Sequence, residues 1–151
     1  MASTKRISKE LADITASPLP DISVSLVNNV LHTWSCTIAG PAHTPYSGGT
    51  FTVLVTMPLD YPFKPPSIKF ATRIYHPNIT NDDSGSVCLG LLKSENWKPN
   101  TRVAAVLEAV RGLLVEPNPE DPLETAIAEQ FVQNRAAFDA EAAAMTRKYA
   151  A

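Results

Sequence analysis

Two periodicities divide the chain into segments. Within residues 3–16, apolar residues recur at spacings of four and three, which is the period of an amphipathic helix. These residues are Ile7, Leu11 and Ile14. Ser3 or Thr4 is the expected N-cap, and Pro18 and Pro20 mark the end of the helix. The chain is therefore predicted to begin with a helix.

After these prolines the period changes to that of β-strands. Short segments rich in Val, Ile, Thr and Trp are separated by turn signals at Asn28-Asn29 and at Ser47-Gly48-Gly49. The predicted strands cover residues 22–27, 31–39, 50–57 and 67–70. In the second strand, alternation places Cys36 on an apolar face and polar residues on the opposite face. The pattern predicts a four-stranded antiparallel meander with Cys36 in the core.

Helical periodicity returns in the last third of the chain. One apolar stripe runs through residues 103–114 and predicts a helix that faces the core and stops at Pro117. Asp121 then has the position of an N-cap, with Pro122 at the first helical position and Glu124 in the capping-box position. A further helix is therefore expected to open at this point.

A last helix is predicted near the C-terminus. Its apolar positions are Phe138, Ala142, Met145 and Tyr149. Asn134 is expected to separate it from the preceding helix. The order of elements, an N-terminal helix, four strands and then C-terminal helices, predicts an α+β fold in one domain that covers residues 1–151.

Composition limits the classes of function. The chain is 44% hydrophobic and 19% charged, and it has no apolar run of about 18 residues, so no membrane span is expected. The first residues lack the apolar segment of a signal peptide, which favours a cytoplasmic or nuclear location. A net charge of −2 without a long basic run gives no indication of nucleic-acid binding. Cys36 and Cys88 form neither a CxxC pair nor metal-ligand spacing with the three histidines, so neither a disulfide nor a metal site is expected.

The basic residues are unevenly distributed. Lys5, Arg6 and Lys9 lie together in the first predicted helix, whereas the chain after residue 115 is rich in Asp and Glu. Such a cluster indicates either a specific docking surface or an ordinary solvated helix face.

Cys88 is the first candidate for chemistry. It follows the polar segment HPNITNDDSGSV, and a loop placed this way can expose a sulfur atom while apolar neighbours fix the backbone. A short buried strand is the alternative interpretation. If Cys88 were the nucleophile of a hydrolase, His76 would be the obvious base, although its place before Pro77 favours a structural role in a turn.

Several motifs in order identify a family resemblance. They are YSGG at residues 46–49, YPFKPP at 61–66, HPN at 76–78, VCL at 87–89, ENWKP at 95–99 and PNPEDPL at 117–123. In this order and from the first helix to about Tyr149, the chain resembles the ubiquitin-conjugating enzyme family, as a member consisting of the catalytic core alone.

The resemblance implies a ubiquitin-conjugating fold and a transferase that needs no cofactor of its own. Cys88 would accept ubiquitin as a thioester from the activating enzyme, which spends the ATP, and pass it to a substrate lysine or a ligase cysteine. Asn78 would stabilise the oxyanion or hold the active-site loop, and His76 and Pro77 would be structural. Asp121 would orient the attacking lysine, in addition to any capping role.

The family also implies binding surfaces. Lys5, Arg6 and Lys9 match the surface for the activating enzyme, and the loops with Pro62, Phe63, Pro99 and Asn100 match those that hold ligases of RING or HECT type. Phe63 could instead cover the core. Ser23 matches the sheet face where relatives bind a second, non-covalent ubiquitin.

Three features depart from the common pattern. The segment between Asn78 and Cys88 is two residues longer than in many relatives, Gly90 replaces a residue that is often Asp or Pro, and Glu108 lies where an apolar residue often contacts bound ubiquitin. The alternatives are a conjugator of another ubiquitin-like modifier, a non-catalytic binding module of the same pathway, and an unrelated cysteine hydrolase.

Overall fold

The computed structural model describes residues 2–151. Helix α1 (Ala2–Ala16) is followed by four strands, β1 (Ile22–Val27), β2 (Val30–Ala39), β3 (Thr50–Thr56) and β4 (Ser67–Phe70). The 3₁₀ helix η1 (Gly90–Leu92) precedes the helices α2 (Val103–Val115), α3 (Thr125–Gln133) and α4 (Arg135–Tyr149). The predicted α+β order is confirmed.

The sheet is an antiparallel meander in the order β1-β2-β3-β4. Asn28 and Asn29 both adopt positive φ, of 52° and 60°, in the tight turn between β1 and β2, as their side chains tolerate. Cys36 pairs with Val24 on one side and Val53 on the other and is fully buried, which confirms its predicted place in the core.

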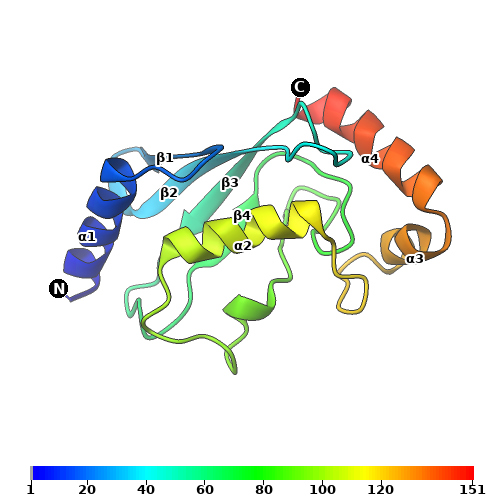
Figure 1. Cartoon of the computed structure of the whole chain (residues 1–151). Coiled ribbons are helices and arrows are strands. Elements are labelled where there is room, and N and C mark those ends of the chain that lie inside the picture. The colour runs from blue at the N-terminus through cyan, green and yellow to red at the C-terminus, as the bar shows by residue number, and fades with distance from the viewer. Residues whose placement is uncertain (1) are drawn as a thin grey trace.

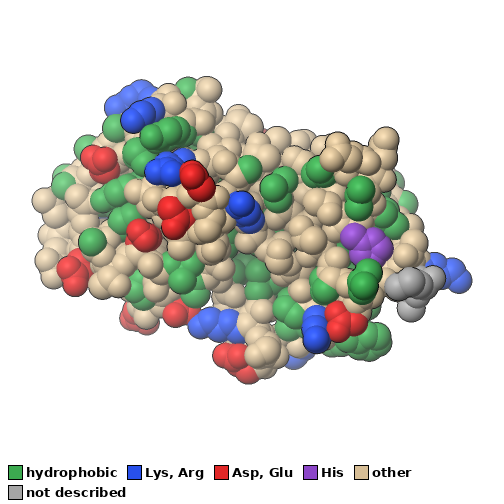
Figure 2. All heavy atoms as spheres, turned by 180° about the vertical axis from the view of Figure 1, so that it is seen from behind, with side chains coloured by type: hydrophobic (Ala, Val, Ile, Leu, Met, Phe, Trp, Pro, Cys, Tyr) green, Lys and Arg blue, Asp and Glu red, His purple; other side chains and the backbone are tan. Residues whose placement is uncertain are grey.

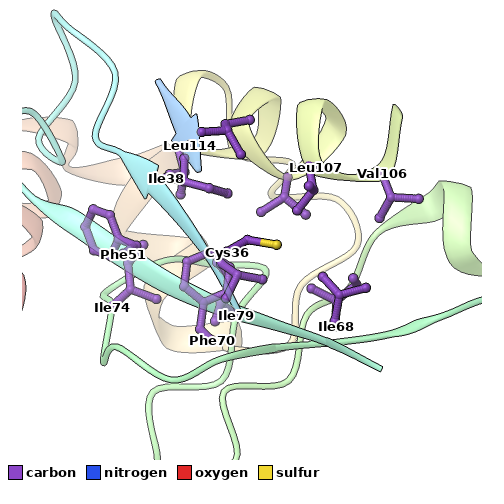
Figure 3. Packing of buried hydrophobic residues seen from close by; sticks show 14 of the residues in the cluster. Cys36, Ile38, Phe51, Ile68, Phe70, Ile74, Ile79, Val106, Leu107 and Leu114 are labelled. Atoms are coloured by element: carbon purple, nitrogen blue, oxygen red, sulfur yellow. The ribbon is translucent and has the colours of Figure 1, made fainter. Parts of the chain in front are cut away.

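Helix α2 crosses one face of the sheet, and α1 and α4 lie toward opposite ends of the molecule (Figure 1). The apolar stripe of α2 is directed at the strands, so Leu107 and Leu114 lie above Cys36, Ile38 and Phe51 (Figure 3). The opposite face, seen from behind, has much of its centre covered by polar side chains and backbone (Figure 2). One sheet face is therefore buried and the other is exposed to solvent, as the alternation of apolar and polar residues predicts.

Two predicted helix caps are wrong. Ser3 and Thr4 lie inside α1, and Ser3 is buried. Asp121 is not an N-cap, because α3 begins only at Thr125, after Glu124. The main-chain N–H groups of Leu123 and Glu124 instead donate to the Pro77 carbonyl, at 2.9 and 3.0 Å, and this tertiary contact holds the segment in an irregular conformation.

The boundary at Asn134 is confirmed. Its backbone ends α3, and its side chain accepts a hydrogen bond from the Ala137 N–H at 3.2 Å, which caps α4. Within residues 2–151, no helix combines the length and the apolar character that a bilayer crossing needs.

Candidate active site

Cys88 lies in the irregular passage between the sheet and α2. Its N–H donates to the Asn78 carbonyl at 2.8 Å, next to a bridge between Ile79 and Val87. The residue is half-buried, and its thiol donates to Asp121 Oδ2 at 3.3 Å. The backbone is thus fixed while the sulfur stays within reach of solvent.

The polar loop before Cys88 is internally bonded. Thr80 N–H donates to the Ser86 carbonyl at 2.9 Å, and Ser86 N–H donates to Thr80 Oγ1 at 2.8 Å. Gly85 has a φ of +54°, and a Cβ there would lie 2.0 Å from the Phe70 carbonyl oxygen. Phe70 N–H donates to the Gly85 carbonyl at 2.8 Å. The loop is therefore attached to strand β4.

His76 is enclosed and its tautomer is determined by its partners. Its Nδ1 accepts from the Asn78 N–H at 3.0 Å, so Nε2 carries the proton that it donates to the Leu113 carbonyl at 2.7 Å. Burial lowers the pKa of His76 from 6.5 to about 4, although the bond to Leu113 opposes this shift. A neutral ring with both nitrogens engaged is a poor general base for Cys88, which weakens the hydrolase alternative.

Asn78 joins two segments through its side chain. Its Nδ2 donates to the carbonyls of Asn118 and Asp121, at 2.7 and 3.0 Å, and its Oδ1 accepts from the Asn118 N–H at 2.9 Å. The residue is buried. Both amide hydrogens are therefore used in fixing the segment that carries Asp121.

Asp121 Oδ2 has two side-chain partners, the Cys88 thiol and the ammonium of Lys93. Lys93 holds the pKa of Asp121 below its usual value, with the Cys88 hydrogen bond acting in the same direction. The pKa of the Cys88 thiol is raised, first by burial and then by the bond and charge of Asp121, whereas Lys93 lowers it. The carboxylate and the ammonium thus act on the thiol with opposite signs.

Lys93 is a site residue that the sequence does not predict. It follows η1 as an ordinary charged residue, and 28 positions separate it from Asp121. No local pattern indicates that the two side chains meet.

The expected binding residues fall into two groups. Lys5 and Lys9 are exposed on α1, but the Arg6 side chain turns inward, bonding Glu10 at 2.8 Å and the Thr101 carbonyl at 3.1 Å. Phe63 is 73% exposed and therefore does not cover the core.

The two loops expected to hold ligases lie side by side. Trp97 donates from its indole nitrogen to the Pro62 carbonyl at 2.8 Å, which joins the loop of Phe63 to the one that carries Pro99 and Asn100. Ser23 lies on the exposed sheet face, where its hydroxyl bonds that of Thr37, its partner across the strands. No cluster of His, Cys, Asp or Glu suited to a metal ion occurs in the described chain from residue 2 onward.

Comparisons with known proteins agree with this architecture. A profile of the family described as "Ubiquitin-conjugating enzyme" matches residues 6–146. The "Ubiquitin-conjugating enzyme E2 14" of Schizosaccharomyces pombe is 49% identical over 138 residues, which cover 91% of this chain and 88% of the relative.

Two further relatives match nearly end to end. The "Ubiquitin conjugating enzyme E2 B" of Dictyostelium discoideum is 43% identical over 150 residues and 99% of both chains. The solved E2 domain of a Toxoplasma gondii ubiquitin conjugating enzyme superposes with a TM-score of 0.88 at 38% identity, covering 97% of this chain and 99% of that one.

Proposed function

Because the chain belongs to the ubiquitin-conjugating enzyme family, whose members are transferases, we propose that it carries ubiquitin as a thioester on Cys88. The main support is the placement of Cys88, with its N–H held by Asn78 and its half-buried thiol beside Asp121. A raised thiol pKa and a His76 ring whose two nitrogens are both engaged suit a carrier whose thioester must resist water.

Charging exchanges one thioester for another. Cys88 Sγ attacks the carbonyl carbon of ubiquitin on the activating enzyme, the new C–S bond forms and the old one breaks. The proton of Cys88 passes to the departing thiolate through solvent. In discharge, a neutral lysine amine attacks the same carbon, an amide forms, and Cys88 leaves as a thiolate that is then protonated.

Asp121 positions the acceptor. A free lysine with a pKa of about 10.4 is almost entirely an ammonium at neutral pH, so it needs a partner that orients it while it loses a proton. The Asp121 carboxylate is half exposed and lies beside the sulfur, where an incoming amine can reach it. This placement favours direct transfer to lysine over transfer through a ligase cysteine.

Asn78 is assigned to positioning rather than to the oxyanion. Its two amide hydrogens already bind the carbonyls of Asn118 and Asp121, and an oxyanion would have to displace one of them. His76 and Pro77 support the same turn, His76 by its two ring bonds and Pro77 by accepting from Leu123 and Glu124.

The family's general partners are ubiquitin, an activating enzyme and ligases, and we assign surfaces to them. Exposed Lys5 and Lys9 on α1 are proposed to contact the activating enzyme, with Arg6 anchoring the helix to the loop at Thr101. The exposed Phe63, with Pro62, Pro99 and Asn100, is proposed to hold a ligase. The polar sheet face at Ser23 is proposed to hold a second ubiquitin.

The test is a charging assay with activating enzyme, ATP and ubiquitin, resolved on reducing and non-reducing gels. Wild type should form a reducible adduct, Cys88→Ser a reductant-stable oxyester and Cys88→Ala none. An adduct with another ubiquitin-like modifier but not with ubiquitin would transfer the proposal to that modifier. An adduct that persists in Cys88→Ala would refute the assignment of the nucleophile.

A further inference from the structure

Lys93 contributes an ammonium to the site without an assigned task. Its Nζ binds Asp121 Oδ2, the same atom that accepts the Cys88 thiol at 3.3 Å. The three side chains come from separate segments, namely the residue after η1, the segment before α3 and the end of the polar loop. A protein lysine thus already lies on the carboxylate that an acceptor lysine would use.

We propose that Lys93 is an internal competitor of the acceptor lysine and thereby sets the acceptor specificity of the enzyme. The inference rests on the proposed function, because it requires a thioester on Cys88 and an acceptor that binds Asp121. Both lysines present the same ammonium group, and the carboxylate oxygen nearest the sulfur is already occupied by Lys93 together with the Cys88 thiol. An acceptor must displace Lys93 before its amine can approach the thioester.

The exposure of the pair is suited to displacement. The Lys93 and Asp121 side chains are 40% and 46% exposed, so water screens their attraction and either partner can exchange. An ion pair buried from solvent would instead be costly to break. The site therefore holds Lys93 in a replaceable contact.

Lys93 is held in its charged form. Asp121 raises the pKa of Lys93 by its hydrogen bond and its charge, which keeps the nitrogen protonated and hence non-nucleophilic at neutral pH. Acceptors with several interactions beyond the ammonium can overcome the competition, whereas an isolated lysine has only its charge. Lys93 would thus discriminate against acceptor lysines that make no contact with the enzyme beyond the ammonium group.

The test measures discharge of the purified ubiquitin thioester to free lysine at increasing lysine concentration. Lys93→Met should lower the KM for lysine about two- to fivefold, the range expected for releasing an exposed ion pair, whereas kcat should not rise, because Lys93 favours the departing thiolate. Lys93→Arg, which keeps a cation on Asp121, should retain the wild-type KM. Lys148→Met, an exposed lysine on α4, is the matched control.

A double-mutant comparison separates competition from structural damage. In the Asp121→Asn background, Lys93→Met should no longer lower the KM, because the shared carboxylate is gone. The inference would be overturned if Lys93→Met left the KM for lysine unchanged or raised it, or if the KM decreased equally in both backgrounds. Ubiquitin linked by an amide to Lys93 would also overturn it. If wild type forms no thioester, the proposed function fails first and the inference fails with it.

Discussion

The charge around Cys88 is set by two residues of opposite sign. Asp121 accepts a hydrogen bond from the thiol and favours its protonated form, while the Lys93 ammonium on the same carboxylate oxygen favours the thiolate. Burial adds to the effect of Asp121, so the pKa of the thiol lies above its ordinary value. The reactivity of the free enzyme toward electrophiles should therefore respond to both side chains.

Substitution of either charge should move the pH profile of Cys88 alkylation. Asp121→Asn should shift the midpoint of the iodoacetamide rate to lower pH, because the negative charge that disfavours the thiolate is removed. Lys93→Met should shift it to higher pH. Cys36 is fully buried and does not compete for the reagent in the folded protein. Shifts in the reverse directions would contradict this account of the site.

Asn78→Ala should destabilise the whole site. The substitution leaves the Asn118 N–H and two carbonyls without their partners, which should lower the free energy of unfolding by about 2–3 kcal/mol. Urea denaturation of wild type and variant measures the difference. A role confined to the oxyanion predicts instead a slow transfer step in a protein of unchanged stability.

The sequence pointed to Cys88 and Asp121 separately, but not to their contact with Lys93. Polar loop composition indicated the first, and motif order matched the second to an acidic position of the family. The Lys93 contact depends on how the segment after η1 packs beside the one before α3, and the 28 positions between the partners carry no periodic signal. The same holds for the His76 tautomer, which follows from its bond to Leu113.

At the scale of elements, Glu10 joins α1 to the start of α2. It is buried, and its carboxylate accepts from the Val103 N–H at 2.7 Å and from the Tyr61 hydroxyl at 2.6 Å, beside Arg6. Arg102, the N-cap residue of α2, makes no side-chain cap. A carboxylate from another helix therefore satisfies the N-terminus of α2 and complements its dipole.

Removal of this carboxylate should weaken the joint between the helices. Glu10→Ala removes the carboxylate partner of Arg6 and leaves the Val103 N–H unsatisfied, so the free energy of unfolding should fall by about 3 kcal/mol. Glu129→Ala, at an exposed position of α3, should change it by less than about 0.5 kcal/mol. Thermal and urea unfolding measure both changes. Equal losses of stability in Glu10→Ala and Glu129→Ala would show that Glu10 does not stabilise the contact between α1 and α2.

The periodicity of apolar residues predicted most helices and strands correctly. The prediction failed where contacts between residues far apart in the sequence determine the backbone conformation. The strands and the helix over residues 103–114 follow from apolar spacing, because each buries one face against the other. The expected cap at Asp121 was wrong because Pro77, far back in the chain, accepts from Leu123 and Glu124. Local capping signals do not account for such a tertiary bond.

At the scale of the whole molecule, His76 lies at the junction of the sheet side and α2. It stacks on Tyr46 at a centroid distance of 5.8 Å and donates to Leu113 near the end of α2. Protonation would place a charge in this buried junction. The stability of the entire fold should therefore depend on the pH range in which His76 titrates.

The free energy of unfolding should decrease as pH falls from about 6.5 to about 4. The unfolded chain binds a proton at its ordinary pKa of 6.5, whereas the folded protein resists protonation until about 4. Integrated over this interval, His76 accounts for a loss of about 3 kcal/mol. Urea titrations at several pH values should show a shallower decrease in His76→Gln. Parallel curves for the two proteins would show that His76 does not carry the effect.

The attachment of the polar loop at both ends has a consequence for how this enzyme can vary. The Phe70–Gly85 bond and the Asn78–Cys88 bond fix the two stems, and in the tip between them the exposed Asp83 forms an ion pair with Arg73 at 2.9 Å. Because the bonds at the stems do not involve the exposed Asp82 and Asp83, exchanges at these two positions should leave the path of the chain into Cys88 unaltered. The tip is thus the part of the loop whose sequence we expect to diverge most readily while the position of the sulfur is kept.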